Sequence, residues 1–329
     1  MRHSLAITTC VLLIAVGAAA AEKPKPPGQA KRGPGGAEYR HKSATRHVYG
    51  AGVDQYWIFE PAEPTPASAP VVVFNHGWIA MSPSVYLGWV HHLVRRGNIV
   101  IYPRYQSTVW TMPWTFTPNA IKAVKRAIEQ LAQPGHVRPE LDKFALVGHS
   151  AGGAISANMA ATTAKEGLPK PRAVMIVMPG RGMKTTNTPF FPPADYRQIP
   201  ADTLLLVLAG DVDRVVGDVT AKEIFRGTPQ IPAERKDYIV VRTDRRGSPP
   251  LVADHVSPCC PYRPGPIITG RRINALDTYG FWKLFDGLTD AAFHGTHREY
   301  ALGNTPQQRF MGTWSDGTPV RELVVTDEP

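Results

Sequence analysis

The sequence predicts an α/β fold in which a mostly parallel central sheet has helices on both faces. Short apolar runs such as VVVF at residues 71–74 are continuous, which is typical of strands buried on both sides. These runs alternate with segments of helical periodicity, and the turns between them are short. No segment repeats with a period of about 20–50 residues, which excludes a solenoid. The composition, 43% hydrophobic and 19% charged, is that of a globular protein.

Residues 1–21 predict a secretory signal peptide. MRHS carries positive charge, the run from Leu5 to Ala21 is apolar, and its closing alanines suit a cleavage site before Glu22. The run is at the short end for a membrane span, so a retained anchor is the less favoured alternative. We therefore expect a secreted or periplasmic protein after cleavage.

Residues 22–47 predict a disordered basic leader. They are rich in Pro, Gly, Lys and Arg and have no apolar period, so they offer little surface to bury. Seven Lys and Arg against two Glu give the leader +5, half of the formal net charge of +10. This charge predicts a weak attraction to anionic surfaces. Nucleic-acid binding is not expected, because no basic helix or aromatic–basic sheet motif accompanies it.

Residues 48–329 are expected to form a single domain, with a C-terminal extension from about residue 289. Breakers end the helical segments, as Pro134-Gly135 does for the second helix. The connection 181–200 is too short for a large cap domain. In chain order we expect strands at 53–61 and 71–74, a helix at 82–97, a strand at 98–103, a helix at 117–135, a strand at 143–148, a helix at 151–167, strands at 172–180 and 203–210, a helix at 218–227, a strand at 236–243 and a helix at 271–288.

The segment VGHSAGG places Ser150 between the predicted strand KFALVG and the helix that follows it. This context indicates a nucleophile elbow, a sharp turn that exposes a serine hydroxyl above the sheet. G-x-S-x-G alone also occurs by chance, so the assignment depends on an acid and a histidine later in the chain.

Asp213 is the favoured acid because it follows the strand TLLLVLAG, and Asp211 is its competitor in the same loop. Three histidines follow, and His255 is favoured because it lies in the loop after the last predicted inner strand. His294 and His297 have H-x-x-H spacing, a weak metal hint without a third ligand nearby. Ser150, Asp213 and His255 in this order predict nucleophilic acyl chemistry.

On these residues the chain resembles the α/β-hydrolase superfamily over roughly residues 48–288. Within it, the chain is similar to secreted serine esterases related to dienelactone hydrolases, cutinases and polyester hydrolases. The resemblance implies no metal and no organic cofactor. It also implies an oxyanion hole made by the backbone N–H groups of Trp78 and Ala151, with Trp78 lining the acyl site.

The aromatic segment YPRYQSTVWTMPWTF suggests an apolar substrate wall of Tyr105, Trp110 and Trp114, although packing beneath the loop is the alternative. The adjacent Cys259 and Cys260 leave three states open: a vicinal disulfide, pairing between molecules, or two thiols. The oligomeric state cannot be derived from the sequence.

The favoured function is a serine hydrolase that cleaves a small-molecule or lipid-like carboxylic ester. A peptidase, lactonase or thioesterase would use the same residues, and a non-catalytic exported binding module is the alternative outside enzymes.

Overall fold

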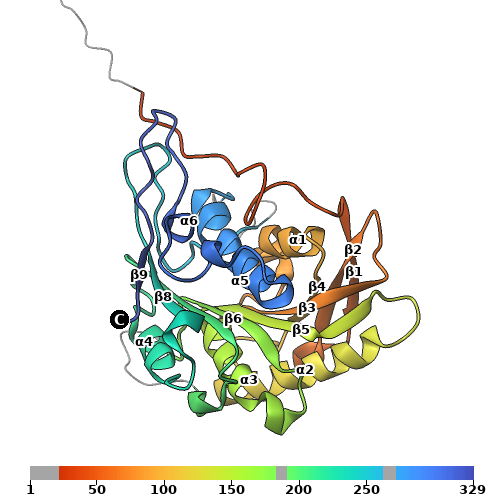
Figure 1. The fold of residues 1–329 in the computed structure, drawn as a ribbon. Helices are drawn as coiled ribbons and strands as arrows, with labels where there is room; N and C mark the ends of the chain where they lie inside the picture. The colour runs from red at the N-terminus through yellow and green to blue at the C-terminus, as the bar shows by residue number, and fades with distance from the viewer. Residues whose placement is uncertain (1–21, 183–190, 262–271) are drawn as a thin grey trace, which may run out of the picture.

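A nine-stranded sheet runs through the middle of the molecule, with helices on both sides (Figure 1). The computed structural model describes residues 22–182, 191–261 and 272–329. The predicted signal peptide therefore lies outside the described residues. Within those ranges, no helix is both long enough and apolar enough to cross a membrane.

The elements follow the predicted alternation, with two additional strands and one short additional helix. In chain order they are β1 (Ser43–Tyr49), β2 (Tyr56–Ala62), β3 (Ser68–Asn75), α1 (Leu87–Arg95), β4 (Ile99–Pro103), α2 (Phe116–Leu131), β5 (Arg138–His149), α3 (Ala151–Glu166), β6 (Pro171–Val177), β7 (Leu204–Gly210), α4 (Val219–Arg226), β8 (Lys236–Val241), α5 (Lys283–His294), α6 (Pro306–Arg309) and β9 (Val324–Thr326). A π-helical segment, Leu276–Trp282, leads into α5.

The strand order is β1-β2-β4-β3-β5-β6-β7-β8-β9. The strands from β4 to β8 pair in parallel, whereas β1, β2 and β9 join the two ends of the sheet antiparallel. The predicted fold class, a mostly parallel sheet covered on both faces, is thus confirmed. Because the inner strands are parallel, their carboxyl ends meet at one edge, where sites form in such sheets.

Two apolar cores lie on opposite faces of this sheet. Helices α2, α3 and α4 cover one face, where Phe116, Ile155 and Ile224 are buried against the sheet. Helices α1 and α5 cover the other, where Trp89 and Leu284 are buried. The inner strands contribute to both cores, which explains their continuous apolar runs.

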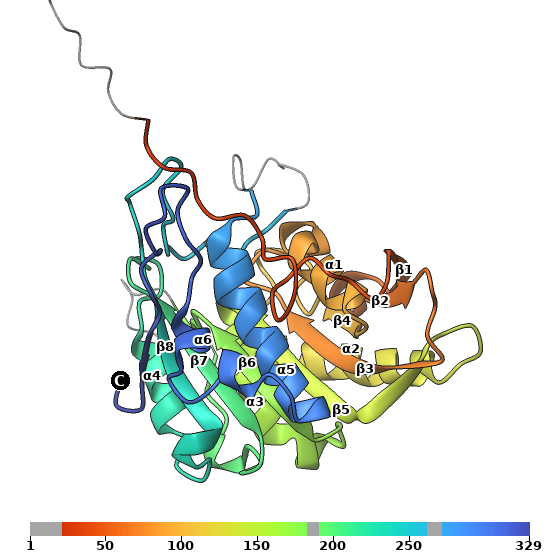
Figure 2. The same cartoon turned by 45° about the horizontal axis from the view of Figure 1, so that its top comes forward.

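The prediction that residues 22–47 are disordered is wrong for this structure. The segment runs across α5 and α1 before it enters β1 (Figure 2). The Gly35 N–H donates to Asp286 Oδ2 at 2.7 Å, and the same oxygen lies 2.9 Å from His92 Nε2 and 3.1 Å from Arg96 Nε. A Cβ at Gly35 would lie 2.1 Å from the Thr278 carbonyl oxygen, so glycine is needed for this approach. Backbone and polar contacts, rather than buried apolar side chains, therefore hold this segment against the rest of the fold.

The C-terminal extension adds an edge strand, β9, and also meets the leader. β9 pairs antiparallel with β8 through Val324–Thr326. Upstream, an isolated bridge joins Thr313 and Pro319. Ser315 exchanges two hydrogen bonds with Lys25, from Ser315 N to Lys25 O at 3.0 Å and from Lys25 N to Ser315 Oγ at 2.9 Å. The extension therefore closes one end of the sheet.

Candidate active site

Ser150 occupies the sharp corner between β5 and α3. β5 ends at His149, α3 begins at Ala151, and the Ser150 backbone has φ 57° and ψ −124°. A positive φ is uncommon for a residue with a side chain and marks a strained turn. The backbone thus has the conformation expected of a nucleophile elbow.

Small residues are required on both sides of this corner. A Cβ at Gly148 would lie 2.1 Å from the Gly152 carbonyl oxygen, and a Cβ at Gly152 would lie 2.1 Å from the Asn75 carbonyl oxygen. Both obstacles are backbone atoms, so they cannot turn aside as the end of a side chain could. Close packing of β3, β5 and α3 therefore explains the two glycines of the motif.

The structure brings Ser150, His255 and Asp213 together. His255 Nε2 lies 2.9 Å from Ser150 Oγ, and His255 Nδ1 lies 2.7 Å from Asp213 Oδ2. A carboxylate only accepts hydrogen bonds, so the imidazole donates from Nδ1 and presents its Nε2 lone pair to the serine hydroxyl. This is the arrangement in which a histidine accepts the proton of an attacking serine.

Asp213 is held for this contact, whereas Asp211 has a different partner. The other Asp213 oxygen accepts the N–H groups of Val215 at 2.9 Å and Val216 at 3.1 Å. The Asp211 carboxylate instead accepts from the backbone N–H of Thr243 at 2.8 Å and from its hydroxyl at 2.6 Å. Geometry therefore favours Asp213, as predicted.

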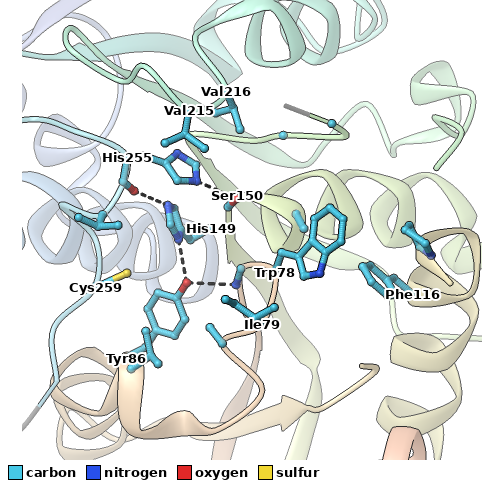
Figure 3. Close-up of a pocket in the computed structure, with 18 of the residues that line it drawn as sticks. Trp78, Ile79, Tyr86, Phe116, His149, Ser150, Val215, Val216, His255 and Cys259 are labelled. Carbon is cyan, nitrogen blue, oxygen red and sulfur yellow. Dashed lines mark hydrogen bonds between the residues drawn. The ribbon is translucent and has the colours of Figure 1, made fainter. Parts of the chain in front are cut away.

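An apolar cavity of about 310 Å³ opens at Ser150 (Figure 3). Its walls combine aromatic and branched aliphatic side chains, and no described lining residue is Asp, Glu, Lys or Arg. The apolar lining comes mainly from Trp78, Ile79, Val85, Pro113, Phe116, Phe191, Val215, Val216 and Val256. Such a cavity suits an uncharged hydrocarbon group beside a reactive serine.

Comparison with known proteins places this site in a family. Residues 72–210 match a family model described as alpha/beta hydrolase fold. The family model and the order of the strands together identify an α/β-hydrolase fold. The family supports a hydrolase activity. The match includes Ser150 but ends before Asp213 and His255, so their assignment rests on the contacts above. A search of curated proteins found no match.

Both residues expected to form the oxyanion hole of this α/β hydrolase line the cavity. Ala151 follows Ser150 directly and is the first residue of α3, whose N-terminus favours negative charge. Trp78 follows β3, and its ring packs edge-on to Phe116 at a centroid distance of 6.4 Å. Trp78 therefore lines the cavity as expected, while its acyl-site role and the role of its N–H stay predictions.

The other three aromatic residues predicted as a substrate wall do not line the cavity, so that prediction is wrong. Tyr105 is fully buried behind it, where its ring stacks on His76 at a centroid distance of 4.0 Å. Trp110 and Trp114 are 83% and 61% exposed, respectively, on the loop before α2. The cavity uses Pro113 and Phe116 from the same stretch instead.

The sequence reasoning missed a chain of hydrogen bonds beside the serine (Figure 3). The Gly77 N–H donates to the Tyr86 hydroxyl at 3.1 Å, and this hydroxyl lies 2.8 Å from His149 Nδ1. His149 Nε2 lies 2.8 Å from the backbone oxygen of His255. That oxygen only accepts, so His149 donates from Nε2, and Tyr86 donates to its Nδ1.

This chain connects the loop before Trp78 to the loop that carries His255. Burial raises the pKa of Tyr86 well above its ordinary value, which keeps the phenol protonated as a donor. The histidine of the GHS motif was visible in the sequence, but its partner Tyr86 lies far from it in the chain. No spacing rule therefore indicated the contact.

The histidines of the H-x-x-H pair lie outside the cavity, whereas one of the two adjacent cysteines lines it. His297 Nδ1 pairs with Asp290 Oδ2 at 2.9 Å, and neither histidine of the H-x-x-H pair lines the cavity. Cys259 and Cys260 are buried thiols, and Cys259 lines the cavity. The Cys260 sulfur accepts the backbone N–H of Trp89 at 3.2 Å, and burial raises the pKa of this thiol.

Proposed function

We propose that this α/β hydrolase cleaves carboxylic esters through an acyl-enzyme on Ser150, outside the cytoplasm. The observation that carries the proposal is the continuous contact from Asp213 through His255 to Ser150 at the mouth of an apolar cavity. In this contact, the Ser150 hydroxyl has a proton acceptor in His255, and His255 has a carboxylate partner in Asp213. The resemblance to secreted dienelactone-hydrolase, cutinase and polyester-hydrolase enzymes favours the same class.

In the proposed reaction, His255 takes the hydroxyl proton of Ser150 while Oγ attacks the ester carbonyl carbon. Asp213 stabilises the imidazolium that forms. The oxyanion accepts hydrogen bonds from the N–H groups of Trp78 and Ala151, each worth about 3–4 kcal/mol of barrier. His255 then protonates the departing alcohol, and the acyl group stays on Ser150. A water molecule repeats the sequence and releases the acid.

The cavity lining favours an uncharged acyl or aryl group. A charged substrate group placed there would lose water without gaining an opposite charge from the described walls. The volume of about 310 Å³ is at the lower end for a small-molecule site. We therefore expect small to medium acyl esters to react best.

An ester panel tests this function. Purified protein is assayed on nitrophenyl esters of increasing acyl length, with a lactone, a thioester and a peptide anilide alongside. We expect Ser150→Ala to lower kcat by a factor on the order of 10⁶ and Asp213→Asn by about 10⁴. Asp211→Asn, a carboxylate change in the same loop, is the matched control and should retain most turnover. Preferential hydrolysis of the lactone, thioester or anilide would replace the ester assignment.

Two further measurements separate the alternatives. A serine-directed fluorophosphonate should add one label to the wild type and none to Ser150→Ala, as seen by intact mass. Absence of labelling in the folded wild type would favour a non-catalytic binding module. Export is tested by N-terminal sequencing of the protein from the producing cells, which should begin at Glu22.

A further inference from the structure

Three potential metal ligands meet at the edge of the sheet formed by β1 and β2. His47 lies on β1, Glu60 lies on β2, and His136 lies in the connection between α2 and β5. One ligand atom from each lies within 4.8 Å of the other two. Among the described residues, this is the one cluster of three His, Cys, Asp or Glu with such proximity. The predicted H-x-x-H pair is not part of it.

The two imidazoles converge on the same carboxylate oxygen. His136 Nδ1 lies 2.8 Å and His47 Nε2 lies 3.1 Å from Glu60 Oε2. Tetrahedral zinc with bonds of about 2.0–2.1 Å places neighbouring ligand atoms about 3.3 Å apart. Each of these two separations therefore needs to widen by only about 0.2–0.5 Å to admit an ion. Small side-chain adjustments supply such changes.

Outer contacts already orient two of these ligands. The second Glu60 oxygen accepts the Val137 N–H at 2.6 Å, which leaves Oε2 directed at the histidines. On the far side of the His136 ring, Nε2 lies 3.0 Å from the Tyr49 hydroxyl. Metal-binding histidines usually donate their second ring N–H to such a partner, which fixes the ring.

Burial also differs among the three in a way that suits an open site. The side chains of His136 and Glu60 are 5% and 4% exposed, whereas that of His47 is 32% exposed. A buried carboxylate requires compensation by positive charge or donors. Solvent reaches the cluster at His47, so an ion can enter there and a water can fill the fourth position.

From this geometry we propose that His47, Glu60 and His136 bind one Zn²⁺ ion, separate from the proposed catalytic residues. Two imidazoles and one carboxylate suit zinc, whereas calcium and magnesium prefer all-oxygen sets. The ion would tie the β1–β2 hairpin to the α2–β5 connection. Because zinc binds the folded arrangement, it stabilises the fold in proportion to its affinity.

Proton positions balance in both states. Without metal, His136 donates from Nδ1 to Glu60 and accepts the Tyr49 hydroxyl proton at Nε2. With zinc on Nδ1, the ring proton moves to Nε2, and the Tyr49 oxygen becomes its acceptor. Similarly, His47 carries its proton on Nδ1 when Nε2 binds the ion.

Zinc titration of mature protein without a histidine tag tests the site. The protein is stripped with a chelator, desalted, and titrated with Zn²⁺ in competition with a chromogenic chelator. We expect one ion per chain, retained through desalting, and a rise in Tm on binding. Glu60→Gln keeps the Val137 contact but loses the charge, and it should abolish retention, as should His47→Ala.

Two further variants separate a built site from adventitious binding. Tyr49→Phe removes the nearer outer partner of His136 Nε2, leaves the Gln130 amide at 3.4 Å in place, and should weaken zinc binding by about 10–100-fold. His297→Ala, at an exposed histidine outside the cluster, should leave affinity unchanged. Equal zinc affinity in the wild type, Glu60→Gln and His47→Ala proteins would overturn the proposal, as would loss of binding in His297→Ala alone. These readouts do not depend on ester turnover.

Discussion

Replacing Tyr86 by phenylalanine would remove one oxygen atom from the buried chain of hydrogen bonds beside Ser150. That oxygen accepts the Gly77 N–H at 3.1 Å and donates to His149 Nδ1 at 2.8 Å. The variant leaves a buried donor and a buried acceptor without this partner, and each such group costs about 1–3 kcal/mol. We therefore expect the free energy of unfolding to fall by about 2–6 kcal/mol, and Tm by about 3–10 °C.

Activity should fall through positioning, because Tyr86 does not touch the reacting atoms in the proposed mechanism. Loss of the chain loosens the loop before Trp78, so kcat should drop about tenfold or more while KM changes little. Urea unfolding and ester kinetics measure the two effects. Tyr238→Phe is the matched control, since this equally buried hydroxyl has no hydrogen-bond partner among the described residues. A Tyr86→Phe protein within about 0.5 kcal/mol of the wild type, with normal kcat, would refute the reasoning.

Three further outcomes are expected. Burial opposes ionisation of Asp286, but its charged partners and hydrogen bonds hold its pKa below the ordinary value. The stabilisation that the Asp286 carboxylate gives the fold is therefore complete above about pH 4 and is lost as pH falls through the lower folded pKa. Asp286→Asn should flatten that acid dependence in urea unfolding and make the leader sensitive to limited proteolysis, whereas an unchanged pH profile would contradict this. Gly152→Ala should give little soluble folded protein because its Cβ meets backbone oxygen, while Gly28→Ala, with nothing within 4 Å, should match the wild type by circular dichroism. Trp110→Ala should leave acyl-length selectivity unchanged within about twofold, whereas Trp78→Ala should alter this selectivity on the same ester panel. A change in selectivity with Trp110→Ala alone would show that Trp110 does contact the substrate.

The elements that place the site could be predicted because their signals are local. Continuous apolar runs identify the inner strands, and the order Ser150, Asp213, His255 follows strand ends that meet at one edge. Strand β1 was missed because it is an exposed edge strand, SATRHVY, that lacks an apolar face. The leader was misjudged because its backbone is held by Asp286, a partner distant in sequence.

Composition does not predict which residues far apart in the sequence come into contact in the fold. Aromatic residues in the loop before α2 predict burial or binding in general, but not which rings face the cavity. Phe116 does so and Trp110 does not. Similarly, His47 and His136 belong to segments with no common motif. The pairing of β1 with β2 brings His47 near Glu60, whereas His136 reaches it from the connection between α2 and β5.

The pairing of Lys25 with Ser315 has a consequence for how the molecule is made. These partners are separated by 290 positions, so the first of them leaves the ribosome long before the second. At about 5–20 residues per second, the delay is about 15–60 s. The contact between Lys25 and Ser315 therefore forms only after residue 315 has been synthesised, and until then the leader remains accessible to chaperones and to the export machinery that we propose handles this chain.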